Sequence, residues 1–211
     1  MLTLYSTALS ANGRKVLAVS RHLELDIDVR EVNVYRGEGR RAEYLAINPS
    51  GKIPTLVDGD LTLFESNAIM LYLSEAHGDC RLWSRDPKER GRIARWLFWE
   101  SAHWQPALAV LLAACVGHRL LPKIVPPPAA APDWSAAALA PLMHELDTAL
   151  SASPFVAGDA LTIADFAVAG MCTYFDVAGF PFEKHPAFND WHRRIGMLDA
   201  WRATREALWC T

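Results

Sequence analysis

The sequence predicts a chain of two parts, an α/β half over residues 1–77 and an all-helical half over residues 87–211. Three observations support this fold class. Strand and helix patterns alternate through the first half in the order βαβ, helix, ββα. No strand pattern follows residue 86. The chain has 211 residues and is 51% hydrophobic, so it is long and apolar enough to form one large domain or two small ones with a core.

Each element of the first half has its own signal. Apolar residues at helical spacing follow Ser10, and alternating apolar and polar residues from Ile27 onward indicate a strand. Residues 48–51 (Asn-Pro-Ser-Gly) end a short helix, and residues 58–60 (Asp-Gly-Asp) form a hairpin turn. The predicted elements are strands over 2–5, 27–34, 55–57 and 61–63, and helices over 10–22, 40–47 and 65–77.

Helical patterns fill the second half. Asp86 and Pro87 form a helix start, because proline fits the first turn of a helix. The prolines between residues 122 and 134 exclude a helix there. Thr162 and Asp165 match a capping box, so we expect Asp165 to be a buried helix cap rather than a catalytic group. The predicted helices cover 87–121, 135–150 and 162–178, with one or two more over 186–201.

Composition excludes several classes of function. The formal net charge of −3 provides no large positive field, so no nucleic-acid partner is expected. The four cysteines form no CxxC pair, which argues against a metal site and a redox dithiol and favours reduced thiols in the cytoplasm. The longest apolar stretch, 107–116, is too short to span a bilayer, and the first residues resemble a strand rather than a signal peptide, so no membrane partner is expected.

Two motifs with complementary polar groups lie in the α/β half. Residues 52–56 (Lys-Ile-Pro-Thr-Leu) enter a strand through an X-Pro bond, where a cis peptide can turn the preceding backbone outward. Glu65 and Ser66 begin a helix, and such a start binds anions because its free N–H groups and its dipole face the ligand. Together the motifs can hold a small extended peptide by its backbone and its carboxylate. From the residues alone, a trans proline and an ordinary N-cap serine remain the alternatives.

The order and spacing of four motifs are similar to those of the cytosolic glutathione transferases, in particular bacterial members of serine or serine/asparagine type. The resemblance covers nearly the whole chain. It implies a thioredoxin-like first domain over residues 1–77, a helical second domain over 87–211 with the second-substrate site, a homodimer, and glutathione as co-substrate without a metal. The motifs are Ser10-Ala11-Asn12, residues 48–54 (Asn-Pro-Ser-Gly-Lys-Ile-Pro), residues 65–69 (Glu-Ser-Asn-Ala-Ile) and the segment from Gly158-Asp159 to Asp165-Phe166.

The resemblance also implies roles for the residues that match glutathione-binding positions. The backbone of Ile53, before a cis Pro54, would pair with the cysteinyl unit of glutathione. Ser66 would bind the γ-glutamyl carboxylate and Glu65 the γ-glutamyl amine. Lys52 would lie near the glycyl carboxylate, although a solvated loop lysine is nearly as good an interpretation.

The chemistry of this family needs a thiolate. A free thiol has a pKa of about 8.5, and each unit by which the pKa falls requires about 1.4 kcal/mol of preferential stabilisation of the anion. A hydroxyl at the start of the first helix, assisted by the helix dipole, supplies it. We predict Ser10 as the catalytic donor, because it begins that helix, and Asn12 as a second donor. The other candidates are Tyr5, Ser6 and Thr7.

The second substrate would lie between the domains, against the long helix. His103, Trp104 and Leu108 are the candidates there, with Trp209 covering the site from near the C-terminus. Packing in the core or in an interface is the alternative for each of these residues.

These assignments predict an enzyme that conjugates glutathione to a small hydrophobic electrophile. One alternative is a glutathione-dependent disulfide or peroxide reductase, although the first 79 residues contain no cysteine for a mixed disulfide. Another is a non-catalytic binding protein of this fold, against which Ser10, Pro54 and Ser66 argue. A glutathione-dependent isomerase would need a basic pocket. Arg14 and Lys15 are available for one, but an exposed helix face explains them as well.

Overall fold

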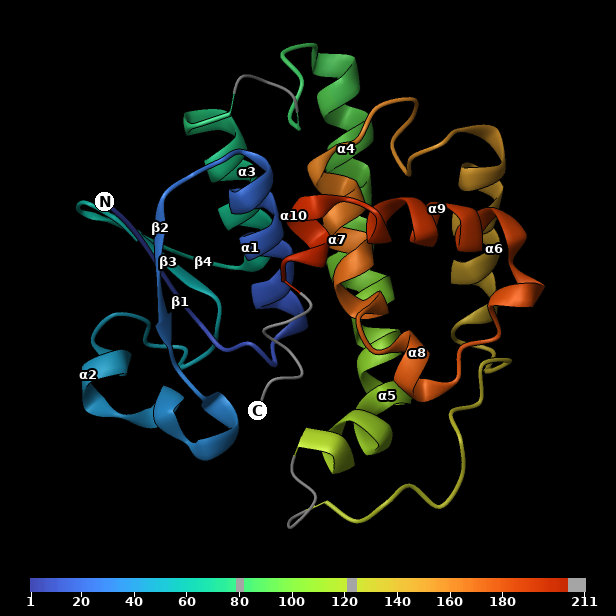
Figure 1. Ribbon diagram of the computed structural model, residues 1–211, viewed down its shortest axis with the longest axis horizontal. Helices are drawn as coiled ribbons and strands as arrows, with labels where there is room; N and C mark the ends of the chain where they lie inside the picture. Colours follow the sequence, from blue (N-terminus) through green and yellow to red (C-terminus); the bar gives the residue numbers. More distant parts are fainter. Residues whose placement is uncertain (79–81, 121–124, 205–211) are drawn as a thin grey trace. The chain divides into compact units, whose positions relative to one another are not determined.

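The computed structural model describes residues 1–78, 82–120 and 125–204. These residues form two compact units (Figure 1). The first unit contains the described residues of 1–83 together with 198–204, and the second contains those of 84–197.

A mixed sheet forms the centre of the first unit. Among the described residues it has four strands in the order β2-β1-β3-β4. β1 runs parallel to β2 and antiparallel to β3, and β3 pairs with β4 as a hairpin. This is the predicted βαβ, helix, ββα order. The strands are β1 (Leu2–Ser6), β2 (Ile27–Glu31), β3 (Thr55–Asp58) and β4 (Leu61–Phe64).

The segment after β2 departs from the prediction. The strand ends at Glu31 rather than at Val34, because the Asn33 side chain accepts a hydrogen bond from the Arg36 N–H at 3.2 Å and starts a 3-10 turn. The predicted helix over 40–47 is reduced to a single α-helical turn. The segment contains η1 (Val34–Arg36), η2 (Glu38–Arg40) and α2 (Ala42–Leu45).

Two helices cover one side of the sheet. α1 (Ala11–His22) packs against α3 (Ser66–Ala76), and both lie on the same side of the strands in Figure 1. Apolar residues at helical spacing bury one face of each helix, and Val19 in α1 and Leu73 in α3 are fully buried. The predicted bounds of both helices agree with the structure to within a residue at each end.

The C-terminal helix α10 (Asp199–Arg202) packs against α1 in the first unit, although the sequence placed it in the helical domain over 87–211. Arg14 of α1 makes much of this contact. Its guanidinium lies 4.0 Å from the centre of the Trp201 ring, and its Nε donates to Thr204 Oγ1 at 2.9 Å. Arg14 is 7% exposed and Lys15 is fully buried, so the interpretation of both as part of an exposed helix face is wrong.

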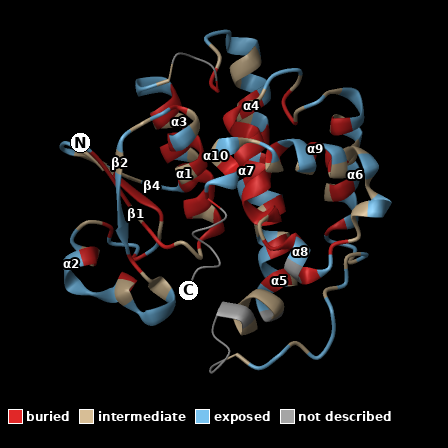
Figure 2. Ribbon diagram, viewed as in Figure 1, coloured by how far each residue is buried: buried red, intermediate tan, exposed pale blue. Residues whose placement is uncertain are grey.

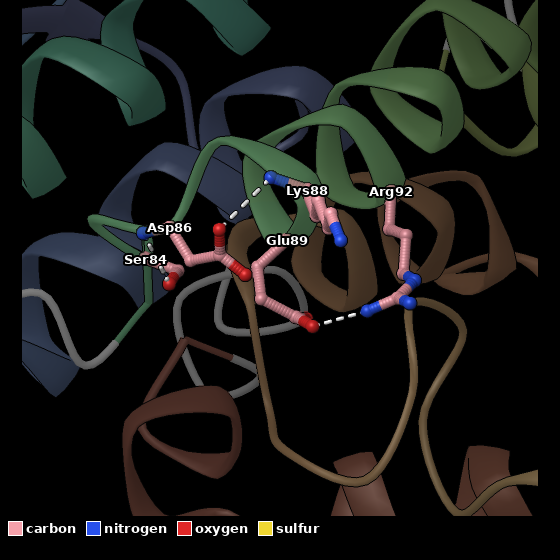
Figure 3. A network of polar contacts seen from close by, with 5 residues as sticks. All are labelled: Ser84, Asp86, Lys88, Glu89 and Arg92. Atoms are coloured by element: carbon pink, nitrogen blue, oxygen red, sulfur yellow. Dashed lines mark hydrogen bonds and ion pairs between the residues drawn. The ribbon is translucent and has the colours of Figure 1, made fainter.

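The second unit begins with α4 (Pro87–Trp99), whose start is the predicted one. Figure 3 shows the polar contacts at this helix end. The Asp86 carboxylate accepts a hydrogen bond from the Lys88 N–H at 3.2 Å, and the Asp86 N–H donates to Ser84 Oγ at 3.1 Å. Glu89 and Arg92 form an ion pair one turn apart. The carboxylate cap and the proline in the first turn determine where the helix begins.

The long helix predicted over 87–121 is interrupted. A π-helical turn, η3 (Glu100–Trp104), separates α4 from α5 (Gln105–Leu120). Pro106 explains the interruption, because proline has no N–H to donate and its ring displaces the carbonyl one turn before it. The sequence contains this signal, although the apolar pattern continues through it.

Two further helices differ from their predicted bounds. The sixth helix begins at Ala140 rather than near 135, with Pro141 in its first turn. The helix predicted over 162–178 breaks after Cys172, where the N–H groups of Thr173 and Tyr174 bond to carbonyls three residues earlier instead of four. The resulting helices are α6 (Ala140–Ala152), α7 (Ile163–Cys172), α8 (Phe175–Ala178), η4 (Phe182–Lys184) and α9 (Pro186–Gly196).

α7 is the central helix of the second unit. All ten of its residues are buried, and it is red along its length in Figure 2. It packs against α4, α5 and α9. A helix that is apolar on every side fits this position, because neighbouring helices cover all of its faces.

Asp165 fixes the start of α7, as predicted. It is fully buried, and its carboxylate accepts hydrogen bonds from the N–H groups of Val156 at 3.0 Å and Thr162 at 2.9 Å, and from the Trp191 indole at 2.9 Å. Burial raises the pKa of Asp165 to about 6, although these donors favour the ionised form. The capping box is therefore part of a buried network that joins α7 to α9.

Candidate functional site

Ser10 lies at the N-terminus of α1 with its hydroxyl group oriented by the helix. It is 7% exposed, and its Oγ accepts a hydrogen bond from the Gly13 N–H at 3.0 Å. Among the described residues the Ser10 hydroxyl donates to no other group. The first turn of α1 contains no acidic residue. The hydroxyl proton is therefore available to an anion at the positive end of the helix dipole.

Gly13 allows the start of α1 to lie directly on the end of β1. A Cβ at this position would be 1.9 Å from Ser6 Oγ and 3.3 Å from Ser10 Cβ. The Ser6 hydroxyl is buried and has no hydrogen-bond partner among the described residues. The glycine is thus explained by the side chain of Ser6, which fills the space that a residue 13 side chain would need.

The N-termini of α1 and α3 are joined by a hydrogen bond. Ser66 Oγ donates to Asn12 Oδ1 at 3.3 Å, and Ser66 is 8% exposed. Glu65, the residue before α3, is exposed and has φ of +70°. A non-glycine residue in this region is strained by about 1–3 kcal/mol, and such strain is found at ligand-binding positions. Two predicted binding residues and the predicted second donor therefore share one region of the first unit.

The Ile53-Pro54 peptide bond is cis, as the resemblance implies. Ile53 is half-buried, and neither its N–H nor its carbonyl group forms a hydrogen bond within the part of the chain that the structure describes. Both groups can therefore pair with the backbone of an extended peptide ligand.

Basic side chains lie next to this segment. Lys52 is exposed and forms no ion pair with a described residue. Arg40 was not among the predicted site residues, yet its Nη1 lies 3.3 Å from the point that a Cβ on Gly51 would occupy. Sequence alone did not indicate this contact, because Arg40 and Gly51 come together only through the backbone approach of Gly39 to Gly51.

The predicted second-substrate residues have different environments in the second unit. Trp104 and Leu108 are fully buried, and the Trp104 indole donates to the Val168 carbonyl at 3.1 Å. In this structure they belong to the core and expose no surface to a substrate. His103 is exposed on the π-helical turn. Trp209 lies outside the described residues.

The described residues contain neither a metal-binding cluster nor a membrane-spanning helix. No group of three or more His, Cys, Asp or Glu side chains is arranged to hold a metal ion. No described helix is both long enough and apolar enough to cross a membrane.

The arrangement has a definite chemical capacity. The first unit contains a hydroxyl donor at the N-terminus of α1, the N-terminus of α3 joined to α1 by the Ser66–Asn12 hydrogen bond, and the Ile53 peptide group before β3 with the exposed Lys52 beside it. Such a set can bind an extended peptide with terminal carboxylates and can stabilise a negative charge beside Ser10.

The sequence of this chain matches two domain families. Residues 4–81 match the family described as "Glutathione S-transferase, N-terminal domain". Residues 128–194 match "Glutathione S-transferase, C-terminal domain". The chain is 34% identical over 176 residues to glutathione S-transferase F10 of Arabidopsis thaliana, covering 79% of this chain and 77% of that protein.

Solved structures have the same fold. Glutathione transferase F7 of Populus trichocarpa has a TM-score of 0.86 at 26% identity, with 99% of each chain covered. Glutathione transferase BmGSTD1 of Bombyx mori has a TM-score of 0.82 at 28% identity, with 98% of this chain and 96% of that chain covered. The predicted fold class, a thioredoxin-like domain followed by a helical domain, is confirmed.

Proposed function

Because this chain belongs to the glutathione S-transferase family, we propose that its first unit binds glutathione and that Ser10 stabilises the thiolate of the bound tripeptide. The chain is a glutathione transferase, and the reductase alternative is not favoured. The assignment of Ser10 rests on the geometry of its hydroxyl group. The hydroxyl accepts a hydrogen bond from the Gly13 N–H of the helix and keeps its own proton for the ligand.

In the proposed reaction, the glutathione thiol loses its proton to solvent and the thiolate accepts a hydrogen bond from Ser10. The Gly13 N–H that donates to Ser10 Oγ polarises the hydroxyl and strengthens it as a donor. The sulfur then attacks an electrophilic carbon of a small hydrophobic molecule and forms a thioether, while the leaving group departs with its electron pair. The helix dipole of α1 lowers the free energy of the anion before attack.

The remaining contacts would hold the tripeptide backbone. The N–H and carbonyl of Ile53, next to Pro54, pair with the cysteinyl unit. The α3 N-terminus with Ser66 takes the γ-glutamyl carboxylate, and Glu65 takes the amine. The hydrogen bond from Ser66 occupies Asn12 Oδ1 and leaves the Asn12 Nδ2 group available as the second donor to sulfur. Lys52 binds the glycyl carboxylate. His103 remains a candidate for contact with the electrophilic substrate, because its side chain is exposed.

The homodimer is part of the proposal. Large apolar side chains are exposed in both units: Phe98 (73%) and Val110 (82%) on α4 and α5, and Phe64 (47%) on β4. Covering such side chains with a second copy would remove their apolar surface from water, which favours association. Sedimentation should give twice the chain mass of 23.4 kDa, and a monomer at micromolar concentration would contradict the assignment. The cytoplasmic location stays a prediction from the sequence.

Steady-state conjugation of glutathione to an activated aryl halide tests the proposed role of Ser10. Ser10→Ala should lower kcat by about 10²–10³-fold, because one preorganised donor to a developing anion is removed. The Kd for glutathione should change much less. Ser151→Ala is the matched control, since that exposed serine on α6 donates only to the Asp147 carbonyl at 2.8 Å. Equal kcat in Ser10→Ala and Ser151→Ala would remove Ser10 from the mechanism.

A further inference from the structure

Two buried side chains hold the carbonyl group of Lys52. The Tyr44 hydroxyl donates to Lys52 O at 2.6 Å, and Asn48 Nδ2 donates to the same oxygen at 3.0 Å. Tyr44 is 5% exposed and Asn48 is fully buried. A carbonyl oxygen has two lone pairs, so these two short bonds satisfy it, and the longer 3.5 Å contact from Thr55 Oγ1 to the same oxygen is not needed.

One assignment of protons satisfies the whole cluster. The Tyr44 proton goes to Lys52 O, so in the 2.8 Å contact between Tyr44 and Thr55 it is the Thr55 hydroxyl that donates. Thr55 Oγ1 accepts from the second Asn48 N–H at 2.8 Å. Asn48 Oδ1 accepts from both the N–H and the hydroxyl of Ser50. Burial raises the pKa of Tyr44, so the phenol keeps the proton that it donates.

The cluster determines the direction of the Ile53 N–H. The peptide between Lys52 and Ile53 is trans, and in a planar trans peptide the C=O and N–H groups point in opposite directions. Because the Lys52 carbonyl points into the buried cluster, the Ile53 N–H points away from it. That N–H bonds to no group in the described part of the chain.

A second contact supports the same loop, residues 49–55. Gly39 and Gly51 approach so closely that a Cβ on either would lie within 2.6 Å of the other's carbonyl oxygen. The segment over 38–45 therefore supports the loop over 49–55 at two places, through the glycine pair and through Tyr44.

We propose that Tyr44 and Asn48 are positioning residues for the ligand-binding peptide group of Ile53. They touch no ligand themselves, and they act by orienting one N–H before the ligand arrives. The inference rests on the proposed function, in which Ile53 pairs with the cysteinyl unit of glutathione. A preorganised donor lowers the conformational cost of binding, so the effect falls on glutathione affinity and not on the chemical step at Ser10.

Tyr44→Phe removes only the hydroxyl group and tests the inference. We expect the glutathione Kd, measured by calorimetry, to rise five- to tenfold, which corresponds to about 1.0–1.4 kcal/mol. At saturating glutathione, kcat should stay within twofold of the parent. Tyr72→Phe is the matched control in the same unit, since its hydroxyl donates to Asp58 at 2.7 Å, and it should leave the Kd unchanged.

Thr55→Val and Thr55→Ser keep the inference testable if Tyr44→Phe does not fold. Thr55 is fully buried, and valine has its shape without its hydroxyl. Thr55→Val should raise the glutathione Kd. Thr55→Ser keeps the hydroxyl group and should leave the glutathione Kd at the value of the parent protein.

The outcomes separate the two proposals. A parent protein that binds glutathione while Tyr44→Phe and Thr55→Val bind it equally well would overturn the positioning role alone. A parent protein that binds no glutathione would overturn the proposed function, and the inference with it. A fall in kcat at saturation with an unchanged Kd would also contradict the positioning role.

Discussion

Gly13→Ala tests how tightly the first turn of α1 packs against the end of β1. The added Cβ would lie 1.9 Å from Ser6 Oγ, 3.2 Å from Ser6 Cβ and 3.3 Å from Ser10 Cβ. Ser6 is 4% exposed, so its hydroxyl can turn away only within a packed interior. Gly91, in α4, is the matched control because a Cβ there would meet nothing within 4 Å.

The two substitutions should have opposite effects on the free energy of unfolding. Replacing glycine by alanine in a helix contributes about 0.5–1 kcal/mol of stability, and Gly91→Ala should show this gain. Gly13→Ala receives the same gain, but forcing extra volume into a packed site costs about 1–3 kcal/mol. The net change for Gly13→Ala should be a loss of up to about 2.5 kcal/mol.

Urea unfolding of the parent and both variants provides the measurement. Gly13→Ala should also lower kcat, because the clash displaces the turn that carries Ser10. The double variant Ser6→Gly/Gly13→Ala removes the two contacts to Ser6 and should recover most of the stability and turnover. The reasoning is refuted if Gly13→Ala is as stabilising as Gly91→Ala and leaves kcat unchanged.

Three further predictions concern glutathione binding and α7. Ser66→Ala should raise the glutathione Kd at least tenfold, since it removes a hydrogen bond to a carboxylate worth about 1.5–3 kcal/mol, and calorimetry would detect it. Asp165→Ala should cost more than the 1–2 kcal/mol or so of a simple cap, because three buried N–H donors lose their acceptor; thermal melts would show this. The pKa of Asp165 is raised from 3.8 to about 6 in the folded state, so the folded protein binds this proton more tightly. Its contribution to stability should therefore grow by about 1.3 kcal/mol as the pH falls from 7 to 5, and Asp165→Asn should lack that gain in pH-dependent unfolding. A parent and an Asn variant with the same pH slope would contradict the raised pKa.

Local signals in the sequence predicted most of the secondary structure. The starts of α1 and α4 follow from capping residues, and the hairpin from its turn, because these features depend on residues a few positions apart. The break at Pro106 was equally local, but the continuous apolar pattern concealed it. The site residues Ser10, Ile53 and Ser66 came from motif order, and the structure adds the geometry on which their proposed roles rest.

Other features depend on contacts between distant segments. Trp104 and Leu108 face the core rather than a surface, and a helical pattern does not reveal which apolar residues remain accessible. The burial of Arg14 follows from α10, which is far away in the sequence. Asn48 resembles an ordinary turn residue until Tyr44 and Thr55 are placed beside it. Gly13 had no explanation before its contact with Ser6 was known.

The thiol pKa of bound glutathione is the most direct test of the central claim, that Ser10 stabilises the thiolate. Thiolate absorbance in the ultraviolet would be followed across pH for the parent and Ser10→Ala, each saturated with glutathione. The account predicts a pKa at least one unit below the free value of about 8.5 in the parent, and a return toward that value in the variant. A pKa that is depressed equally in both proteins would contradict the claim and would place the thiolate donor elsewhere in the first unit.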